Sequence, residues 1–250
     1  MNIEKSITLP YGRQLAYAEF GKPDGFPILY FHGSPASRLE PLLVGDDVLQ
    51  NLHLRVIAPD RQGIGQSTFQ PRRKFSDWPS DVFVLANELK LDKFSILGNS
   101  GGGPYVTVCA AQIPERIHSP VIVSGGRRMD SPEAIASLPF INRLVFIFAG
   151  KAPILLKMML SMMTTSGVGD RDKELAQMKQ RMPLSDFAAF EQPGRIEALH
   201  AMIRESMRNG TKGVTWDTHL YVRELVLTWM KFTSRSSCFM ANKMLMFSSH

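Results

Sequence analysis

The sequence predicts an α/β fold, in which the strands of a mostly parallel β-sheet are joined by crossover helices and covered by a helical cap. Short apolar runs alternate with segments of helical periodicity up to about residue 126, as is typical of such a sheet. Beyond residue 127 the apolar residues keep a helical spacing and include many methionines. With 250 residues, of which 44% are hydrophobic, the chain can bury one substantial core.

Short apolar runs bounded by glycine, proline and polar residues predict the strands. We expect them at residues 6–9, 14–20, 26–31, 54–58, 94–97 and 120–123. The first two runs flank Tyr11 and Gly12, a pair that fits a hairpin turn. The sheet should therefore open with two antiparallel strands.

Three helices are predicted between the later strands. The first should begin near Ser37, because Ser37 and Glu40 have the spacing of a capping box. The second should cover residues 77–91, where apolar side chains recur at helical spacing. The third should repeat this spacing after Gly102 and end at Pro114, since proline cannot continue a helix.

These patterns divide the chain into three segments. Residues 1–126 are expected to form the α/β core and residues 127–215 the helical cap. Residues 216–250 are expected to return to the core, with the late strands missing or altered. A methionine-rich helical face is most often adaptable core, and here it can also line a pocket for an apolar small-molecule substrate.

The charge pattern argues against nucleic acid as a partner. The formal net charge is +6, but the basic residues cluster only at residues 72–74 and 127–128. No aromatic residues are interleaved with them in the way that stacking on bases requires. We interpret both clusters as solvated surface.

The cysteines and the apolar segments indicate in which cellular compartment the protein is expected. Cys109 and Cys238 have neither paired nor metal-ligand spacing, which fits a reducing compartment, so a cytoplasmic protein is expected. The N-terminus lacks the apolar run of a signal peptide. The apolar stretch 138–163 is interrupted by three basic residues, so no membrane span is expected. The sequence does not indicate an oligomeric state.

A glycine-flanked serine follows the predicted strand at 94–97. In Gly98-x-Ser100-x-Gly102 the backbone must turn so sharply that side chains beside the serine would clash, and the turn presents the hydroxyl to solvent. A phosphate-binding glycine loop would need a lysine or a dinucleotide spacing, and neither is present. The pattern therefore predicts that Ser100 is a nucleophile.

An earlier loop can complete the site. His32-Gly33-Ser34-Pro35 follows the strand at 26–31, and an oxyanion hole needs two backbone N–H groups near the reacting carbonyl. We assign these groups to Ser34 and to Gly101, the residue after the nucleophile, because Pro35 has no N–H. His32 is interpreted as a structural residue that holds this loop by hydrogen bonds.

The sequence resembles the fold-1 enzymes of the α/β-hydrolase family. The resemblance reaches to about residue 229, and its central motifs are His32-Gly-Ser-Pro, Asp60-Arg-x-Gly-x-Gly-x-Ser67, Phe75-Ser-Asp-Trp-Pro-x-Asp81-Val and Leu97-Gly-Asn-Ser-Gly-Gly-Gly-Pro-Tyr105. It also extends into the cap, at Pro183-Leu-Ser-Asp-Phe, Glu191-Gln-Pro-Gly and Trp216-Asp217 through Trp229. These motifs are specific for the fold but not for the substrate. The resemblance implies a serine hydrolase that needs neither a metal nor an organic cofactor.

The resemblance also implies a triad acid and a histidine downstream of the cap, in the order serine, acid, histidine. The last acidic residue is Glu224, and the tail departs from the family pattern. Asp130 is the remaining candidate for the acid, because it follows the strand after the nucleophile helix.

None of the other histidines is predicted to act as the base. His53 and His118 precede strands and should lie at the opposite end of the sheet, whereas His200 and His219 fall in helical segments. His250 is the last residue, and chain ends are poorly ordered unless something holds them.

Two functional hypotheses remain open. The first is an enzyme that cleaves an ester, amide or thioester through an acyl-enzyme on Ser100. A serine at this position argues against alkyl-enzyme chemistry of the haloalkane or epoxide type, which needs an aspartate. The second is a catalytically impaired, truncated or alternatively read chain that binds rather than turns over substrate, since a serine without a base is a poor nucleophile.

Overall fold

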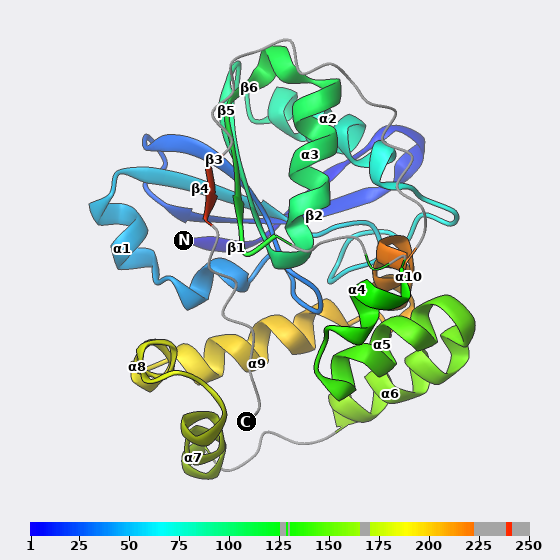
Figure 1. Cartoon of the computed structure of the whole chain (residues 1–250). Helices are drawn as coiled ribbons and strands as arrows, with labels where there is room; N and C mark the ends of the chain where they lie inside the picture. Colours follow the sequence, from blue (N-terminus) through cyan, green and yellow to red (C-terminus); the bar gives the residue numbers. More distant parts are fainter. Residues whose placement is uncertain (126–128, 130, 166–170, 223–238, 242–250) are drawn as a thin grey trace.

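A computed structural model describes the chain except residues 126–128, 130, 166–170, 223–238 and 242–250. The described residues form one seven-stranded sheet with the order β1-β2-β4-β3-β5-β6-β7 (Figure 1). The strands are β1 (Asn2–Thr8), β2 (Gln14–Gly21), β3 (Phe26–Phe31), β4 (Leu54–Pro59), β5 (Phe94–Asn99), β6 (Ile117–Val123) and β7 (Phe239–Ala241). Each predicted strand is present, and the short β7 adds a parallel partner to β6.

The sheet is mixed in the way the sequence predicts. β2 runs antiparallel to both of its neighbours, β1 and β4, while β3, β4, β5, β6 and β7 pair in parallel. Tyr11 and Gly12 turn the chain between β1 and β2 with positive φ values of 65° and 77°. Because parallel strands all end at the same edge, the loops after β3, β4, β5 and β6 gather there.

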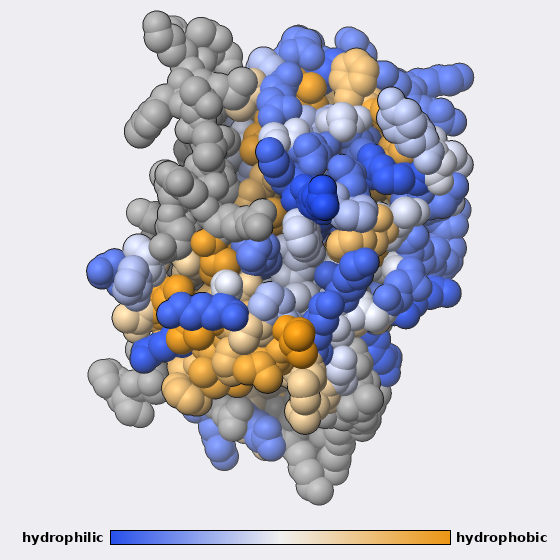
Figure 2. All heavy atoms as spheres, turned by 90° about the vertical axis from the view of Figure 1, so that its right-hand side faces the viewer, coloured by the Kyte–Doolittle hydropathy of each residue, from blue (hydrophilic) through white to orange (hydrophobic). Residues whose placement is uncertain are grey.

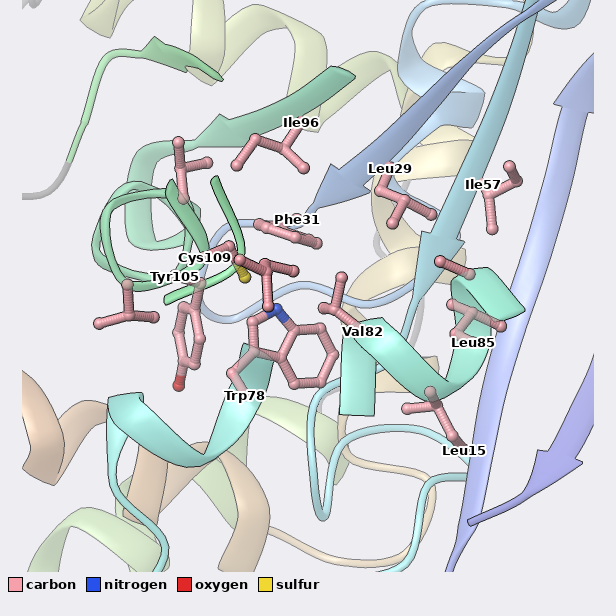
Figure 3. Close-up of a cluster of buried hydrophobic side chains, with 14 of the residues drawn as sticks. Leu15, Leu29, Phe31, Ile57, Trp78, Val82, Leu85, Ile96, Tyr105 and Cys109 are labelled. Carbon is pink, nitrogen blue, oxygen red and sulfur yellow. The ribbon is translucent and has the colours of Figure 1, made fainter. Parts of the chain in front are cut away.

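Helices cover both faces of the sheet. Side chains alternate along a strand, so on β4 Ile57 faces a cluster formed with α2 (Trp78–Glu88) and α3 (Gly103–Gln112), whereas Val56 and Ala58 face a cluster that includes Leu49 of α1 (Asp46–Asn51). Figure 3 shows Leu29, Ile57, Phe31 and Ile96 of the sheet facing Trp78, Val82 and Leu85 of α2. This two-layer contact is the main core.

The helix expected near Ser37 begins later, and that prediction was wrong. Glu40–Leu43 is a short 3-10 helix, and α1 begins only at Asp46, after Gly45 with a φ of 98°. The Ser37 hydroxyl accepts a hydrogen bond from Leu39 N–H two residues on, and Glu40 is buried among polar partners instead of capping a helix. Capping-box spacing depends only on residues close in the sequence, so it does not indicate that the Glu40 carboxylate binds more distant partners.

The segment after the core is helical. Its helices are α4 (Pro132–Ala136), α5 (Phe140–Lys151), α6 (Pro153–Thr165), α7 (Arg171–Arg181), α8 (Leu184–Glu191), α9 (Arg195–Ser206) and α10 (Lys212–Val222). They lie together below the sheet in Figure 1, on the side to which the strand-end loops point. The helical run continues through α10. Within the described residues no helix is both long and apolar enough to cross a membrane.

The core can be tested at Leu29, which is completely buried between the sheet and α2. We expect Leu29→Ala to lower the free energy of unfolding by about 2–5 kcal/mol, because it removes apolar contacts and leaves a cavity. Urea titration followed by circular dichroism measures this loss. Leu52→Ala is the matched control, since Leu52 is 62% exposed and should change stability by less than about 0.5 kcal/mol. Equal losses in both variants would contradict the described core.

Candidate active site

Ser100 occupies the sharp turn between β5 and α3. β5 ends at Asn99, Ser100 has a φ of 47°, and a 3-10 turn over Ser100–Gly102 leads directly into α3. The serine is exposed although both neighbouring elements are buried. A left-handed φ is uncommon for a residue other than glycine, and such conformations concentrate at functional positions. The turn therefore presents a hydroxyl to solvent at the carboxyl edge of the sheet.

The glycines beside Ser100 are required by close backbone packing. A Cβ on Gly98 would lie 2.6 Å from the carbonyl oxygen of Gly102, and a Cβ on Gly102 would lie 2.1 Å from that of Phe31. Both separations are below what any real Cβ tolerates. Alanine at 102 would push the turn away from the end of β3, whereas alanine at 98 would push β5 away from the start of α3. The two glycines therefore allow the tight packing that places Ser100 beside the neighbouring strand end.

The loop after β3 lies directly beside the Ser100 turn. The Ser34 nitrogen is 3.2 Å from the point that a Cβ on Gly101 would occupy, and the Ser100 Cβ is 3.6 Å from the corresponding point on Gly33. The structure thus brings together the main chain of Ser34, the main chain of Gly101 and the Ser100 side chain. The sequence predicted these three residues as one site.

Arg61 holds the peptide that carries the Ser34 N–H. The Gly33 carbonyl accepts hydrogen bonds from Arg61 Nη2 and from His32 Nδ1, each at 2.8 Å. The C=O and N–H of a trans peptide point in opposite directions, so anchoring the Gly33 oxygen directs the Ser34 N–H away from Arg61. Arg61 also donates to the His32 carbonyl.

Glu40 ties this loop to the strand that carries the serine. Its carboxylate accepts hydrogen bonds from Gly33 N–H at 2.8 Å, from Asn99 Nδ2 at 3.0 Å and from the Tyr30 hydroxyl at 3.0 Å. Burial outweighs these hydrogen bonds and raises the pKa of Glu40 above its ordinary value. Asn99 immediately precedes Ser100, so one side chain positions both halves of the site. Sequence reasoning assigned Glu40 only a capping role.

Both ring nitrogens of His32 are engaged. Nδ1 donates to the Gly33 carbonyl, and Nε2 accepts from Arg61 N–H at 3.4 Å. Complete burial, together with repulsion from the Arg61 guanidinium, holds the pKa of His32 well below its ordinary value, so the ring is neutral. This arrangement supports the interpretation that His32 stabilises the loop.

A buried charge cluster lies behind the site. Asp217 of α10 accepts hydrogen bonds from Arg61 Nη2 at 2.7 Å and from Arg73 Nη2 at 2.6 Å, and the Tyr105 hydroxyl also donates to it. Burial opposes ionisation of Asp217, but the two guanidinium groups outweigh it and hold the pKa of this carboxyl well below its ordinary value. Sequence reasoning did not assign Asp217 a site role, and the only available signal was the Trp216-Asp217 motif.

α10 makes a second contact with the site through Tyr221. Its buried hydroxyl donates to the carbonyl of Gly101, the residue after the serine. A Cβ on Gly101 would lie 2.6 Å from this hydroxyl, so a larger residue would displace the Tyr221 side chain. One helix therefore supports the strand-end loop through Asp217 and the serine turn through Tyr221.

The remaining candidates for the triad acid and base lie away from Ser100 or outside the residues that the structure describes. Asp130 and His250 are outside the described residues. His53 and His118 are exposed at the opposite end of the sheet, next to the starts of β4 and β6. His219 lies on α10, with Nδ1 hydrogen-bonded to the Ala149 carbonyl at 2.7 Å. Among the residues that the structure describes, no group of three or more His, Cys, Asp or Glu side chains is arranged to hold a metal ion.

Comparisons with known proteins bear on the fold of this chain. The sequence profile of the alpha/beta hydrolase fold matches residues 27–152, just over half of the chain. A 2-hydroxymuconate semialdehyde hydrolase of Pseudomonas putida is 35% identical over 103 residues, which cover 40% of this chain and 36% of that protein. A non-heme chloroperoxidase of Streptomyces lividans is 31% identical over 128 residues, covering 48% of this chain and 44% of that protein.

The matched region thus spans less than half the length of these two curated relatives. Among solved structures, a thermophilic esterase from Thermogutta terrifontis superposes with a TM-score of 0.58 at 23% identity. It covers 88% of this chain and 72% of the esterase chain. At this level of identity the superposition shows a shared fold.

Asp217→Asn tests the buried charge cluster. At pH 7 we expect the free energy of unfolding to fall by about 3–5 kcal/mol, because the variant leaves two buried guanidinium groups without their carboxylate. Since the folded-state pKa of Asp217 is depressed, its stabilising effect is complete above the unfolded pKa of about 4 and is lost as the pH falls further. The difference between the two proteins should therefore be constant from pH 7 to about pH 5 and shrink below about pH 4.

Urea titrations across this pH range measure the difference. Asp24→Asn is the control, because the Asp24 side chain is 79% exposed and should change stability little at any pH. A stability loss in Asp217→Asn that does not depend on pH would contradict an ionised, buried Asp217.

Proposed function

Because this chain belongs to the alpha/beta hydrolase fold family, we propose that it is a hydrolase that cleaves an ester, amide or thioester bond through an acyl-enzyme on Ser100. The observation that carries the proposal is the exposed Ser100 hydroxyl at a left-handed turn, beside the main chain of Ser34 and Gly101. Fold membership alone would not select the reaction, since one fold hosts many chemistries.

The chemistry assigned to each group follows from its position. Ser100 Oγ attacks the substrate carbonyl carbon, and the leaving group departs to leave an acyl ester on the serine. The N–H groups of Ser34 and Gly101 stabilise the oxyanion of the tetrahedral intermediate. Preorganised donors of this kind are each worth about a hundredfold to a thousandfold in rate. Water then attacks the acyl ester and releases the acid.

A base must remove the Ser100 proton, and His32 does not fit this role. Both of its nitrogens are engaged, and burial favours the neutral ring so strongly that it resists accepting a proton. We propose Asp130 as the acid that would orient a histidine, on its sequence position alone, since it lies outside the described residues.

A second candidate function is binding of the same carbonyl compounds without rapid turnover. It is favoured by the engagement of both ring nitrogens of His32. A serine without a base keeps a high pKa and attacks slowly at neutral pH. The two candidates share the same substrate site and differ in the rate of acylation.

Fluorophosphonate labelling with intact mass spectrometry tests Ser100. We expect a single adduct on Ser100, and Ser100→Ala should reduce its rate of formation by at least about a hundredfold, because the attacking oxygen is lost. Ser124→Ala is the matched control, since Ser124 has the same φ of 47° at the end of the neighbouring parallel strand. Labelling that survives in Ser100→Ala would refute the proposed nucleophile, whereas rapid labelling that is lost in Ser100→Ala would refute the binding-only candidate.

The apolar, methionine-rich cap leads to a prediction about substrate class. Fluorophosphonates with medium-length alkyl tails should label Ser100 about tenfold faster than reagents of equal length that end in a carboxylate, because apolar tails gain from burial while a charge loses hydration. Competition between the two reagents, read by intact mass, measures the ratio. A preference for the charged tail would contradict an apolar substrate.

A further inference from the structure

The hairpin formed by α5 and α6 exposes an unusual number of large apolar side chains. α6 folds back along α5 at the lower right of Figure 1, away from the sheet. The exposed apolar residues of this hairpin are Phe140, Ile141, Ile154, Leu155, Met158 and Met162, each at least 47% exposed. Figure 2 shows a continuous hydrophobic surface in the lower part of the face that contains these helices. Contiguous patches of this kind mark interaction sites on soluble proteins.

The same hairpin carries only positive charge. Between residues 134 and 169 the sequence contains Arg143, Lys151 and Lys157 and no aspartate or glutamate. Lys151 and Lys157 are exposed. Long basic side chains can lie over an apolar surface with their charged ends in water, which suits a boundary between an apolar phase and an anionic one.

A cationic cleft adjoins this apolar surface. It has a volume of about 310 Å³, and its lining includes the basic residues Arg72, Lys157 and Lys212 and the aromatic rings of Phe69 and Trp216. The Lys212 ammonium lies 4.2 Å from the centre of the Phe69 ring. Among the residues that the structure describes, no carboxylate lines the cleft. Its chemistry suits a negatively charged group attached to an apolar body.

The cleft and the apolar surface are continuous along α6. Pro153 and Lys157 line the cleft, and their sequence neighbours Ile154 and Met158 project from the adjacent stripe of the same helix. Residues four apart lie on one helical stripe, and residues one apart lie about 100° around the helix. A flat partner with an apolar interior and an anionic surface can therefore contact both features at once.

We propose that the α5–α6 hairpin and the Arg72–Lys157–Lys212 cleft together form a docking surface for an anionic lipid bilayer. The exposed apolar side chains enter the boundary between headgroups and acyl chains, and the basic residues contact the lipid phosphates and carboxylates. A second copy of this chain fits less well, because the face would meet its own positive charge. The proposal concerns surface binding and does not depend on Ser100.

Vesicle co-sedimentation tests the proposal with the full chain. We expect binding to vesicles of phosphatidylcholine mixed with phosphatidylserine to be at least about tenfold stronger than binding to phosphatidylcholine alone, and to weaken as salt rises. Met158→Glu and Ile154→Glu should each reduce binding to the anionic vesicles by about tenfold, because a carboxylate at the boundary opposes both insertion and the anionic surface. Lys212→Glu should reduce the preference for anionic lipid.

Leu52→Glu is the matched control, since Leu52 is 62% exposed at the end of α1, far from this hairpin in Figure 1. It should bind vesicles like the unmodified chain, and urea titration of every variant shows whether the fold is kept. Absence of vesicle binding, equal binding to both lipid mixtures, or equal loss in Leu52→Glu would overturn the proposal. A dimer in size-exclusion chromatography that Met158→Glu converts to monomer, without vesicle binding, would instead assign this face to a second copy.

Discussion

The arrangement of the site depends on one buried carboxylate, that of Asp217. It lies between the guanidinium groups of Arg61 and Arg73, with the Tyr105 hydroxyl as a third donor. Burying such charges costs several kcal/mol for each ion unless nearly all of their hydrogen-bonding capacity is used. Here the capacity of Arg61 is used on the main chain beside the serine, because this residue also donates to the carbonyls of His32 and Gly33. The contacts of Arg61 therefore compensate a buried charge and, at the same time, orient the Ser34 peptide.

Close backbone packing is the second constraint on the site. Gly102 lets the serine turn approach the end of β3, and Gly98 lets β5 approach the start of α3, more closely than any side chain would allow. The Glu40 carboxylate then connects the loop after β3 to Asn99, directly before Ser100. Rigid elements and buried hydrogen bonds hold these groups, as the oxyanion site that we propose would require.

The docking surface and the candidate active site meet at two pairs of adjacent residues. Arg72 lines the cationic cleft, and the next residue, Arg73, binds Asp217. On α10, Trp216 lines the cleft while Asp217 faces the core, and the Trp216 indole donates to the Arg73 carbonyl at 3.0 Å. A partner in the cleft would therefore touch the segments that hold the buried charges beside the candidate site.

The sequence alone determined the features that depend on residues close together in the chain. Alternating apolar runs and a tight turn at Tyr11 and Gly12 gave the strands and the first hairpin, and the glycines around Ser100 indicated the exposed serine, because each pattern acts within a few residues. Capping-box spacing near Ser37 misled for the same reason, since it takes no account of distant partners. Only the tertiary structure decided the contacts of Glu40 and the burial of Asp217, which is 156 positions from Arg61. A charged residue has the same appearance in a sequence whether it is solvated or buried, and only the folded chain brings its compensating charge to it.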